Sequence, residues 1–414
     1  MRYHVLTEIP MSESRILVCC AMPFGYGPAA KLLMLAPLLR HHWQLVFVGH
    51  GIAWELVSRC PECFDRIIEA DADCPKVQTL LHESAGLLSV MDRDFAKLAG
   101  RMHKPCYVVD SLLWMRDEIP PDLTGASIYW AQRFASMPAW AESYQPRPTL
   151  VGPIISIDKV PAVRDRSGLL INLGGAEAVG QRGEHYRAHA EFVLKAILES
   201  GLVNHFEQQV TVVGGSQSIA SLRHDFGGWH LEFASLSPRE TIARIRAAAV
   251  VLTTPGLTNT LECFRNRAKT FFLPPQNYSQ WCVLNQLHQR QLAPSVLRWE
   301  DAFPDLNVQE GLSESARGPL VQMAISRMTT DDAVCRELAA RLKRIPQLAI
   351  ERLVSEHSRF LSSLGPNGTV TIAGHLRSIA TGSIATTTME GNSASPQSVS
   401  PKAVRSSPHV ETIV

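Results

Sequence analysis

The stretch that decides the fold is residues 249–275, which read AVVLTTPGLTNTLECFRNRAKTFFLPP. Its first part is an apolar run of strand length that ends in Pro-Gly. Residues 257–265 then favour a helix, and residues 268–275 form a second apolar run that ends in Pro-Pro. A strand, a helix and a strand in this order predict part of a parallel sheet covered by helices.

The same alternation continues outward in both directions along the chain. Further strands are predicted in the C-terminal half at 169–175, 209–215 and 230–234. In the N-terminal half, strands are predicted at 15–20, 44–48 and 107–110, and near Ile67, Tyr129 and Val151, while 77–98 reads as one helix. We therefore expect an α/β protein with two Rossmann-like domains and a cleft between them.

The length of 414 residues suits two domains. We place an N-terminal acceptor-binding domain at 14–155, a polar linker at 156–167 and a nucleotide-sugar-binding domain at 168–364. A final helix near 347–362 is expected to cross back to the first domain. After residue 365 the composition shifts to Ser, Thr, Ala, Gly and Pro, which predicts a disordered tail over 365–414.

The bulk composition excludes several classes of protein. The chain has 40 basic and 39 acidic residues, so its net charge of +1 gives no field that favours nucleic acid. No apolar stretch reaches the roughly 18 residues of a membrane span, and the N-terminus has no apolar signal region, so we expect a cytoplasmic protein. The nine cysteines are expected as reduced thiols. No cofactor or metal is predicted, because the Asp-x-Asp match at Asp71-Ala72-Asp73 reads as a solvated loop.

Glycines at the ends of three predicted strands in the second half suggest a phosphate-binding crevice. They are Gly174-Gly175, Gly214-Gly215 followed by Ser216, and Gly256. In an open parallel sheet, ligands bind outside the carboxyl ends of the strands, where glycine leaves room and offers backbone N–H groups. Each Gly-Gly taken alone is also compatible with a plain turn.

The helix that follows Gly256 carries Thr258, Thr260 and Glu262. Hydroxyls and free N–H groups at a helix start suit a pyrophosphate, and a carboxylate one turn later can accept both hydroxyls of a ribose. An alternative is that Thr258 caps the helix and Glu262 complements its dipole. Beyond the next strand, Gln280 and Asn285 are amides that suit sugar hydroxyls, or else ordinary surface residues.

The first loop, Gly25-Tyr26-Gly27-Pro28-Ala29-Ala30, fits G-x-G-x-x-A between a strand and a helix. A dinucleotide-binding domain also needs an acidic residue at the end of the second strand. Gly49 and His50 stand there instead, which disfavours an NAD-dependent oxidoreductase. The loop is then either a tight turn or a ligand-facing loop.

Taken in order, these motifs resemble the GT-B glycosyltransferases, in particular the UDP-GlcNAc transferases of peptidoglycan synthesis, over residues 14–360. The resemblance rests on Val151-Gly152-Pro153, Gly174-Gly175, Gly214-Gly215-Ser216-Gln217, Pro255 to Glu262, and Gln280 to Asn285. It implies a UDP-sugar donor and a small-molecule acceptor. Glu262 would hold the ribose, and Gly256, Thr258 and Thr260 the diphosphate. The uracil would lie near Phe233 and Leu236, and Gln280 and Asn285 would meet the sugar.

The loop at Gly25, Tyr26 and Gly27 departs from the peptidoglycan enzymes, which have a Gly-His pair there. It is more similar to cytosylglucuronate synthases, which implies glucuronyl transfer from UDP-glucuronate to cytosine. We expect an inverting, metal-independent transfer, since fixed N–H dipoles can stabilise the leaving diphosphate. The candidate general bases are Asp110, at the end of a buried strand, and His50. A UDP-sugar 2-epimerase and a non-catalytic nucleotide-sugar-binding protein are the alternatives.

Overall fold

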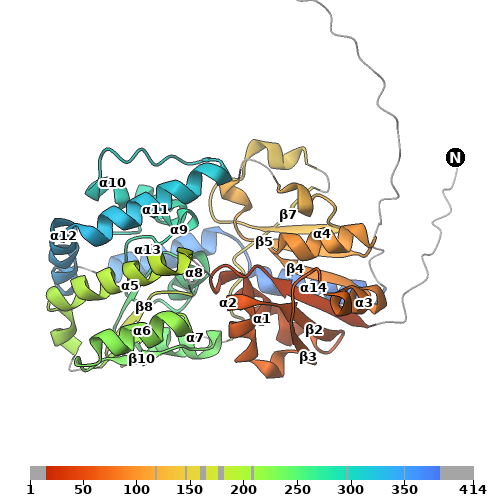
Figure 1. Ribbon diagram of the computed structural model, residues 1–414, viewed down its shortest axis with the longest axis horizontal. Helices are drawn as coiled ribbons and strands as arrows, with labels where there is room; N and C mark the ends of the chain where they lie inside the picture. Colours follow the sequence, from red (N-terminus) through yellow and green to blue (C-terminus); the bar gives the residue numbers. More distant parts are fainter. Residues whose placement is uncertain are drawn as a thin grey trace, which may run out of the picture.

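The computed structural model describes residues 15–116, 119–144, 147–158, 165–175, 181–206, 209–294, 297–348 and 350–382. These residues form two α/β domains that lie side by side, each built on one parallel sheet with helices packed against it (Figure 1). The predicted fold class of two Rossmann-like domains is therefore confirmed.

The N-terminal sheet has seven parallel strands in the order β3-β2-β1-β4-β5-β6-β7. The strands are β1 (Ile16–Ala21), β2 (Gln44–Gly49), β3 (Arg66–Glu69), β4 (Gly86–Val90), β5 (Cys106–Asp110), β6 (Ile128–Gln132) and β7 (Thr149–Val151). The helices of this half are α1 (Gly27–Leu39), α2 (Gly51–Ser58), α3 (Pro75–Glu83) and α4 (Arg93–Arg101). The direction of the strand order changes between β1 and β4, where parallel sheets of this kind bind ligands.

The single helix predicted over 77–98 is wrong, because strand β4 lies in the middle of that range. All five residues of β4 are buried between β1 and β5, where an apolar run of this length pairs on both sides. Asp92 then caps α4 by accepting a hydrogen bond from the Phe95 N–H at 3.2 Å.

The C-terminal sheet has five parallel strands in the order β10-β9-β8-β11-β12. The strands are β8 (Leu169–Asn172), β9 (Val210–Val213), β10 (Glu232–Ala234), β11 (Val250–Thr253) and β12 (Thr270–Phe272). The helices are α5 (Gln181–Glu199), α6 (Ser216–Phe226), α7 (Pro238–Ala247), α8 (Leu257–Arg265), α9 (Tyr278–Gln289), α10 (Trp299–Ala302), α11 (Glu314–Thr330), α12 (Asp332–Lys343) and α13 (Ile350–Ser363). Helix α7 starts at Pro238, after a capping box formed by Ser237 and Glu240.

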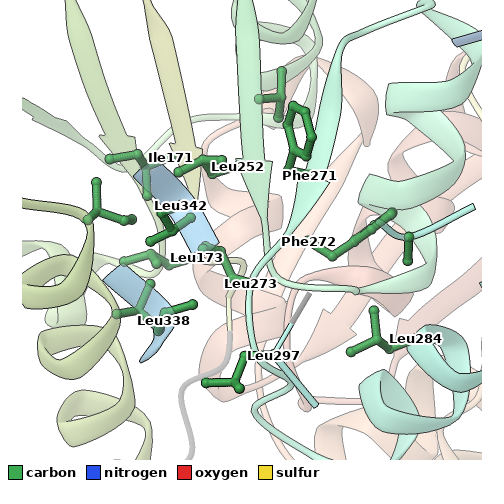
Figure 2. Packing of buried hydrophobic residues seen from close by; sticks show 14 of the residues in the cluster. Ile171, Leu173, Leu252, Phe271, Phe272, Leu273, Leu284, Leu297, Leu338 and Leu342 are labelled. Carbon is green, nitrogen blue, oxygen red and sulfur yellow. The ribbon is translucent and has the colours of Figure 1, made fainter. Parts of the chain in front are cut away.

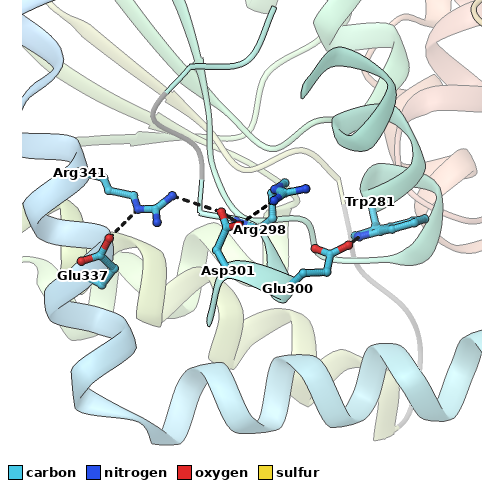
Figure 3. A network of polar contacts seen from close by, with 6 residues as sticks. All are labelled: Trp281, Arg298, Glu300, Asp301, Glu337 and Arg341. Atoms are coloured by element: carbon cyan, nitrogen blue, oxygen red, sulfur yellow. Dashed lines mark hydrogen bonds and ion pairs between the residues drawn. The ribbon is translucent and has the colours of Figure 1, made fainter. Parts of the chain in front are cut away.

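A continuous apolar core covers this second sheet. Figure 2 shows Ile171, Leu252 and Phe271 on neighbouring strands, with Leu338 and Leu342 of α12 close to the end of β8. Around the edge of that core, ion pairs hold the short helix α10 in place (Figure 3). Asp301 pairs with Arg298 at 2.7 Å and with Arg341 of α12 at 3.2 Å.

The chain returns to the N-terminal domain through α14 (Gly368–Ala380), which begins after Asn367 caps its first turn. The expectation of a disordered tail from residue 365 is therefore wrong for this segment. Ile372, Ala373 and Leu376 lie on one face of α14 and pack into the N-terminal core against α1. The apolar stripe is short and lies among Ser, Thr and Gly residues, so the composition of the segment did not indicate a helix. Residues 383–414 of the expected tail lie outside the described part of the chain.

The predicted crossing helix near 347–362 corresponds to α13. Its His357 ring stacks on Phe264 of α8 in the C-terminal domain with a centroid distance of 3.9 Å, and its Phe360 ring lies 5.6 Å from that of Phe134 in the N-terminal domain. The chain then continues into the N-terminal domain through the segment between α13 and α14. Figure 1 shows α14, in blue, among the N-terminal elements.

The two segments that join the domains lie against each other. Gly368 N–H donates to Pro153 O at 2.8 Å, and Thr369 Oγ1 donates to Ile155 O at 2.8 Å. A Cβ on Gly152 would lie 1.8 Å from Pro366 O, so this close approach requires glycine. Of the expected linker 156–167, residues 159–164 lie outside the described residues.

All nine cysteines are free thiols. Among the described residues, no helix combines the length and the apolar character that crossing a bilayer requires.

Candidate functional site

The carboxyl ends of β8 and β11 form the point where the strand order of the C-terminal sheet reverses. Asn172 ends β8, and Thr254 directly follows β11. Asn172 Oδ1 accepts the N–H of Gly174 at 2.9 Å, whereas its Nδ2 has no partner among the described residues. Thr254 Oγ1 and Thr260 Oγ1 are also buried without a partner there. Native proteins satisfy almost all buried polar atoms, so these three atoms are available to hydrogen-bond a ligand at this edge of the sheet.

Two helices of the C-terminal domain begin at this edge with open N-termini. The N-cap residues are Gly256 for α8 and Gly215 for α6, and neither helix has a side-chain cap. Thr258 is the second residue of α8, so the alternative that it caps the helix is wrong. Ser216 is the first residue of α6. The free N–H groups and the positive end of each helix dipole suit an anion.

Glu262 lies one turn into α8 and is only 2% exposed. Its carboxylate accepts the Ser156 N–H at 2.5 Å, the Ser156 hydroxyl at 3.2 Å and the Asn266 amide at 3.3 Å. Burial raises the pKa of this carboxyl, and the bonds from Ser156 oppose the rise. The residue expected to hold a ribose is therefore bound to the segment that joins the domains.

Lys31 of α1 brings a buried cation to the same place. It is 1% exposed, and its Nζ donates a hydrogen bond to Thr258 Oγ1 of α8. Burial lowers the pKa of Lys31 to about 7, against the opposing charges of Glu262 and Asp110. Sequence reasoning missed Lys31, although it is the one charged residue in the apolar helix 27–39.

A cavity of about 50 Å³ lies between the domains. Residues from both domains line it. The N-terminal domain contributes Tyr26 and Ala30 at the start of α1, and the C-terminal domain contributes residues that include Asn172, Leu236, Thr258 and Glu262. Sites for small organic ligands usually measure about 300–1,000 Å³. The cavity as it stands is therefore smaller than a usual site for a ligand of that kind.

Tyr26 fills much of this space. Its hydroxyl donates to Glu55 Oε1 at 2.8 Å and lies 3.4 Å from Ser235 Oγ across the cleft. A Cβ on Gly175 would lie 2.2 Å from the Tyr26 ring, so the ring packs directly on that glycine. Gly25 has a φ of +61° and Gly27 starts α1, and together they place the ring against the second domain.

The remaining predicted donor residues divide into two groups. Gln280 is buried near the end of β8, because it accepts the Gln276 N–H at 2.9 Å and Gln276 in turn donates to Leu173 O. Phe233 of β10 is buried in the C-terminal core. Asn285, on α9, donates to Glu310 Oε1 at 2.7 Å. None of Gln280, Phe233 and Asn285 lines the cavity.

The two candidate bases have opposite surroundings. Asp110 has no exposed surface, and its carboxylate accepts from Tyr129 Oη at 2.7 Å and the Leu112 N–H at 2.6 Å, with Arg116 Nε at 3.3 Å. His50 follows β2, is 43% exposed at its side chain, and lies 3.2 Å from Asp71 Oδ1. The described residues contain no group of three His, Cys, Asp or Glu side chains arranged for a metal ion.

Comparisons with known proteins give the fold. No family model and no curated protein matches the sequence. Among solved structures, Arabidopsis thaliana UGT89C1 in complex with UDP aligns with a TM-score of 0.53 and 11% identity, over 89% of this chain and 100% of that one. The calicheamicin glycosyltransferase CalG4 aligns with a TM-score of 0.48 and 13% identity over 90% and 100%. The spinosyn rhamnosyltransferase SpnG with bound spinosyn aglycone gives 0.46 and 11% over 87% and 99%.

At 11% identity the likeness to UGT89C1 establishes fold alone, and it agrees with the two parallel sheets described above. The chain therefore has the two-domain GT-B fold of glycosyltransferases, as the resemblance of its motifs implied.

Proposed function

We propose that this chain is a glycosyltransferase that moves a sugar from a UDP-sugar to a small-molecule acceptor. The observation that carries the proposal is the set of unpartnered buried polar atoms beside the open N-terminus of α8. Asn172 Nδ2 and the Thr254 hydroxyl, together with the N–H groups of α8, suit a diphosphate. Glu262, one turn further along α8, suits the ribose.

The structure of UGT89C1 with UDP supports a UDP donor, since that protein shares the fold. In the proposed complex, Gly174, Gly215 and Gly256 leave space for the nucleotide at the strand ends. Leu236 lines the cavity and is placed to contact the base, whereas Asn285 is not placed to meet the sugar in the present arrangement. The small cavity requires the domains to separate, or Tyr26 to turn away, before the donor enters.

We further propose an inverting transfer that needs no metal, because helix N-termini and a buried lysine already supply positive charge at the leaving diphosphate. In this reaction the acceptor loses a proton to a general base as its new bond to the sugar forms. His50 fits that role better than Asp110, because the His50 ring is partly exposed while the Asp110 carboxylate is fully engaged.

The finer proposal is glucuronyl transfer from UDP-glucuronate to cytosine. One observation favours a donor with a carboxylate: among the described residues Arg59 Nη1 is buried without a partner, while Arg59 Nη2 pairs with Glu55. The Arg59 guanidinium lies 5.8 Å from the centroid of the Tyr26 ring. A uronate carboxylate that reached this position would supply the missing acceptor.

The first experiment is a thermal-shift panel with UDP, UDP-glucuronate, UDP-GlcNAc, dTDP-glucose, GDP-mannose and NAD. A ligand at 100 times its dissociation constant adds about 2.7 kcal/mol to the free energy of unfolding. Stabilisation by UDP compounds alone supports the proposal, and a preference for UDP-glucuronate supports the finer one. Stabilisation by NAD and not by UDP would contradict both.

A second experiment separates transfer from mere binding. Product formation from the best UDP-sugar is followed by mass spectrometry with cytosine and other small acceptors. Release of UDP with a new glycoside identifies a transferase, conversion of the sugar without an acceptor identifies an epimerase, and binding without either identifies a non-catalytic protein. His50→Ala is expected to lower kcat by about 10²- to 10⁴-fold and to leave UDP affinity unchanged.

A further inference from the structure

The buried amine of Lys31 has fewer hydrogen-bond acceptors around it than its charged form can use. An ammonium group has three N–H donors, and among the described residues the structure gives Lys31 one acceptor, the hydroxyl of Thr258. No ion pair joins Lys31 to a carboxylate of the described residues, although the side chain is only 1% exposed. A buried charge with one neutral partner is costly, and such groups normally have an anionic partner.

The position of Lys31 identifies where that partner belongs. Thr258 is in the first turn of α8, whose open N-terminus points to the site proposed for the diphosphate. A Cβ on Gly27, at the start of α1, would lie 3.6 Å from Thr258 Oγ1, so the first turns of α1 and α8 face each other. An anion bound at the start of α8 thus lies within reach of Lys31 and near the uncapped start of α1.

We propose that Lys31, from the acceptor domain, is the cation that binds the diphosphate of the donor and stabilises the leaving group. The inference rests on the proposed function and adds a residue of the opposite domain to the donor site. When the bond between the sugar C1 and the β-phosphate oxygen breaks, its electron pair stays with that oxygen. The additional negative charge is then stabilised by an N–H of the Lys31 ammonium, which keeps its proton, while the acceptor's proton goes to the general base.

The sharing of one diphosphate between two domains has a physical consequence. In this proposal the uridine binds to the C-terminal domain alone, whereas full affinity for the phosphates requires α1 to lie near α8 with the diphosphate between Lys31 and the start of α8. Removing the charge of Lys31 is therefore expected to lower the affinity for UDP and to leave the affinity for uridine unchanged.

The test is isothermal titration calorimetry at pH 6.5 with UDP and with uridine. Lys31→Met keeps the length of the side chain and removes the charge. A charged hydrogen bond contributes about 1.5–3 kcal/mol, so we expect UDP to bind about 10- to 100-fold more weakly and uridine to bind within twofold of the unmodified protein. The matched control is Lys104→Met, whose amine donates to Ser84 O away from the cleft and whose loss should alter neither affinity.

Equal UDP affinity in Lys31→Met and the unmodified protein would overturn the inference and leave the glycosyltransferase proposal intact. An equal loss for UDP and uridine would also overturn it, because Lys31 would then act on the fold as a whole. If the unmodified protein binds neither ligand, the proposed function and the inference both fail.

A measurement on the unmodified protein covers the case in which Lys31→Met does not fold. A bound phosphate raises the pKa of Lys31. At pH values where Lys31 is neutral in the ligand-free protein, the binding of UDP therefore takes up a proton. We expect the ratio of UDP to uridine affinity to fall at least tenfold from pH 7 to pH 9. Glu262 on α8 and Asp110 on β5 are the carboxyls that act on Lys31, and uridine reports any change at Glu262. A ratio that does not change with pH contradicts the proposal.

Discussion

The carboxyl ends of β5 and of β8 present polar side chains of the same kind, yet their surroundings differ. At β5, the Asp110 carboxylate is bound by Tyr129, Arg116 and a backbone N–H. At β8, Asn172 satisfies its oxygen internally and leaves its Nδ2 without a partner. The Asp110 carboxylate thus has its partners among the described residues, although Arg116 Nε makes only an ion pair with it and no hydrogen bond. Asn172 Nδ2 has no partner there, so we take an unsatisfied polar atom as a better indication of a binding site than a polar residue.

The largest effect on the free energy of unfolding is expected at the end of β5, where Asp110 is buried. Asp110→Ala leaves Arg116 and Tyr129 without their acceptor, and breaking a buried pair of this kind costs about 3–5 kcal/mol. Urea denaturation followed by circular dichroism measures the loss. Asp71→Ala is the control, because its carboxylate is exposed and pairs with no described residue other than His50, so a change within about 0.5 kcal/mol is expected. A stable Asp110→Ala protein with no turnover would make Asp110 the general base.

The buried amine of Lys31, beside the start of α8, should make the stability of the protein depend on pH. Its pKa is about 7 in the folded protein, below the ordinary value of 10.5, so the unfolded chain binds more protons between these two values. The stability of the ligand-free protein relative to Lys31→Met should therefore rise with pH, by about 3 kcal/mol from pH 6 to pH 9. Urea denaturation of both proteins across this range measures it. A stability difference independent of pH would show that Lys31 is satisfied without a ligand.

Gly175→Ala tests the contact that closes the cleft. The added Cβ would lie 2.2 Å from the Tyr26 ring, which must move, and overpacking of this kind costs about 1–3 kcal/mol. We expect a lower melting temperature and a larger radius of gyration in X-ray scattering as the domains separate. Gly228→Ala is the control, because no atom lies within 4 Å of its added Cβ. An unchanged melting temperature would mean that Tyr26 moves freely.

Thr254→Val should have the smallest effect on stability. Its buried hydroxyl has no partner among the described residues, so replacing it leaves stability equal or raises it by up to about 1 kcal/mol, while UDP affinity falls about fivefold. Thr270→Val is the matched control in β12, since that hydroxyl donates to Ala268 O at 3.1 Å and its loss should be destabilising. Thermal melting and calorimetry separate the two outcomes, and a destabilised Thr254→Val protein would contradict the comparison.

The sequence predicted most of the fold because the strands of both sheets are short apolar runs bounded by glycine, proline or charge. It failed at β4, where two short helices and a strand merged into one helical pattern over 77–98. It also failed at α14, whose apolar face is only a few residues wide and gains its stability from tertiary contacts with α1.

The candidate site was predicted in part. The open start of α8 follows from Pro255-Gly256, and the motif resemblance pointed to Glu262, which does line the cavity. The bonds from Ser156 to Glu262 and the contact of Lys31 with Thr258 join residues 106 and 227 positions apart. Such pairs depend on how the two domains pack, and no local pattern in the chain encodes that.

The return of α14 to the first domain also affects the order in which the protein is made. Trp43 and Trp130 of the N-terminal domain donate hydrogen bonds to Leu376 O and His375 Nδ1 of α14, at 3.1 and 3.0 Å. During synthesis these partners emerge only after the whole C-terminal domain, and at about 5–20 residues per second that delay is on the order of 10–40 s. The N-terminal domain thus leaves the ribosome before the C-terminal domain but completes its core after it. Until then it exposes the apolar surface of α1 that α14 later covers.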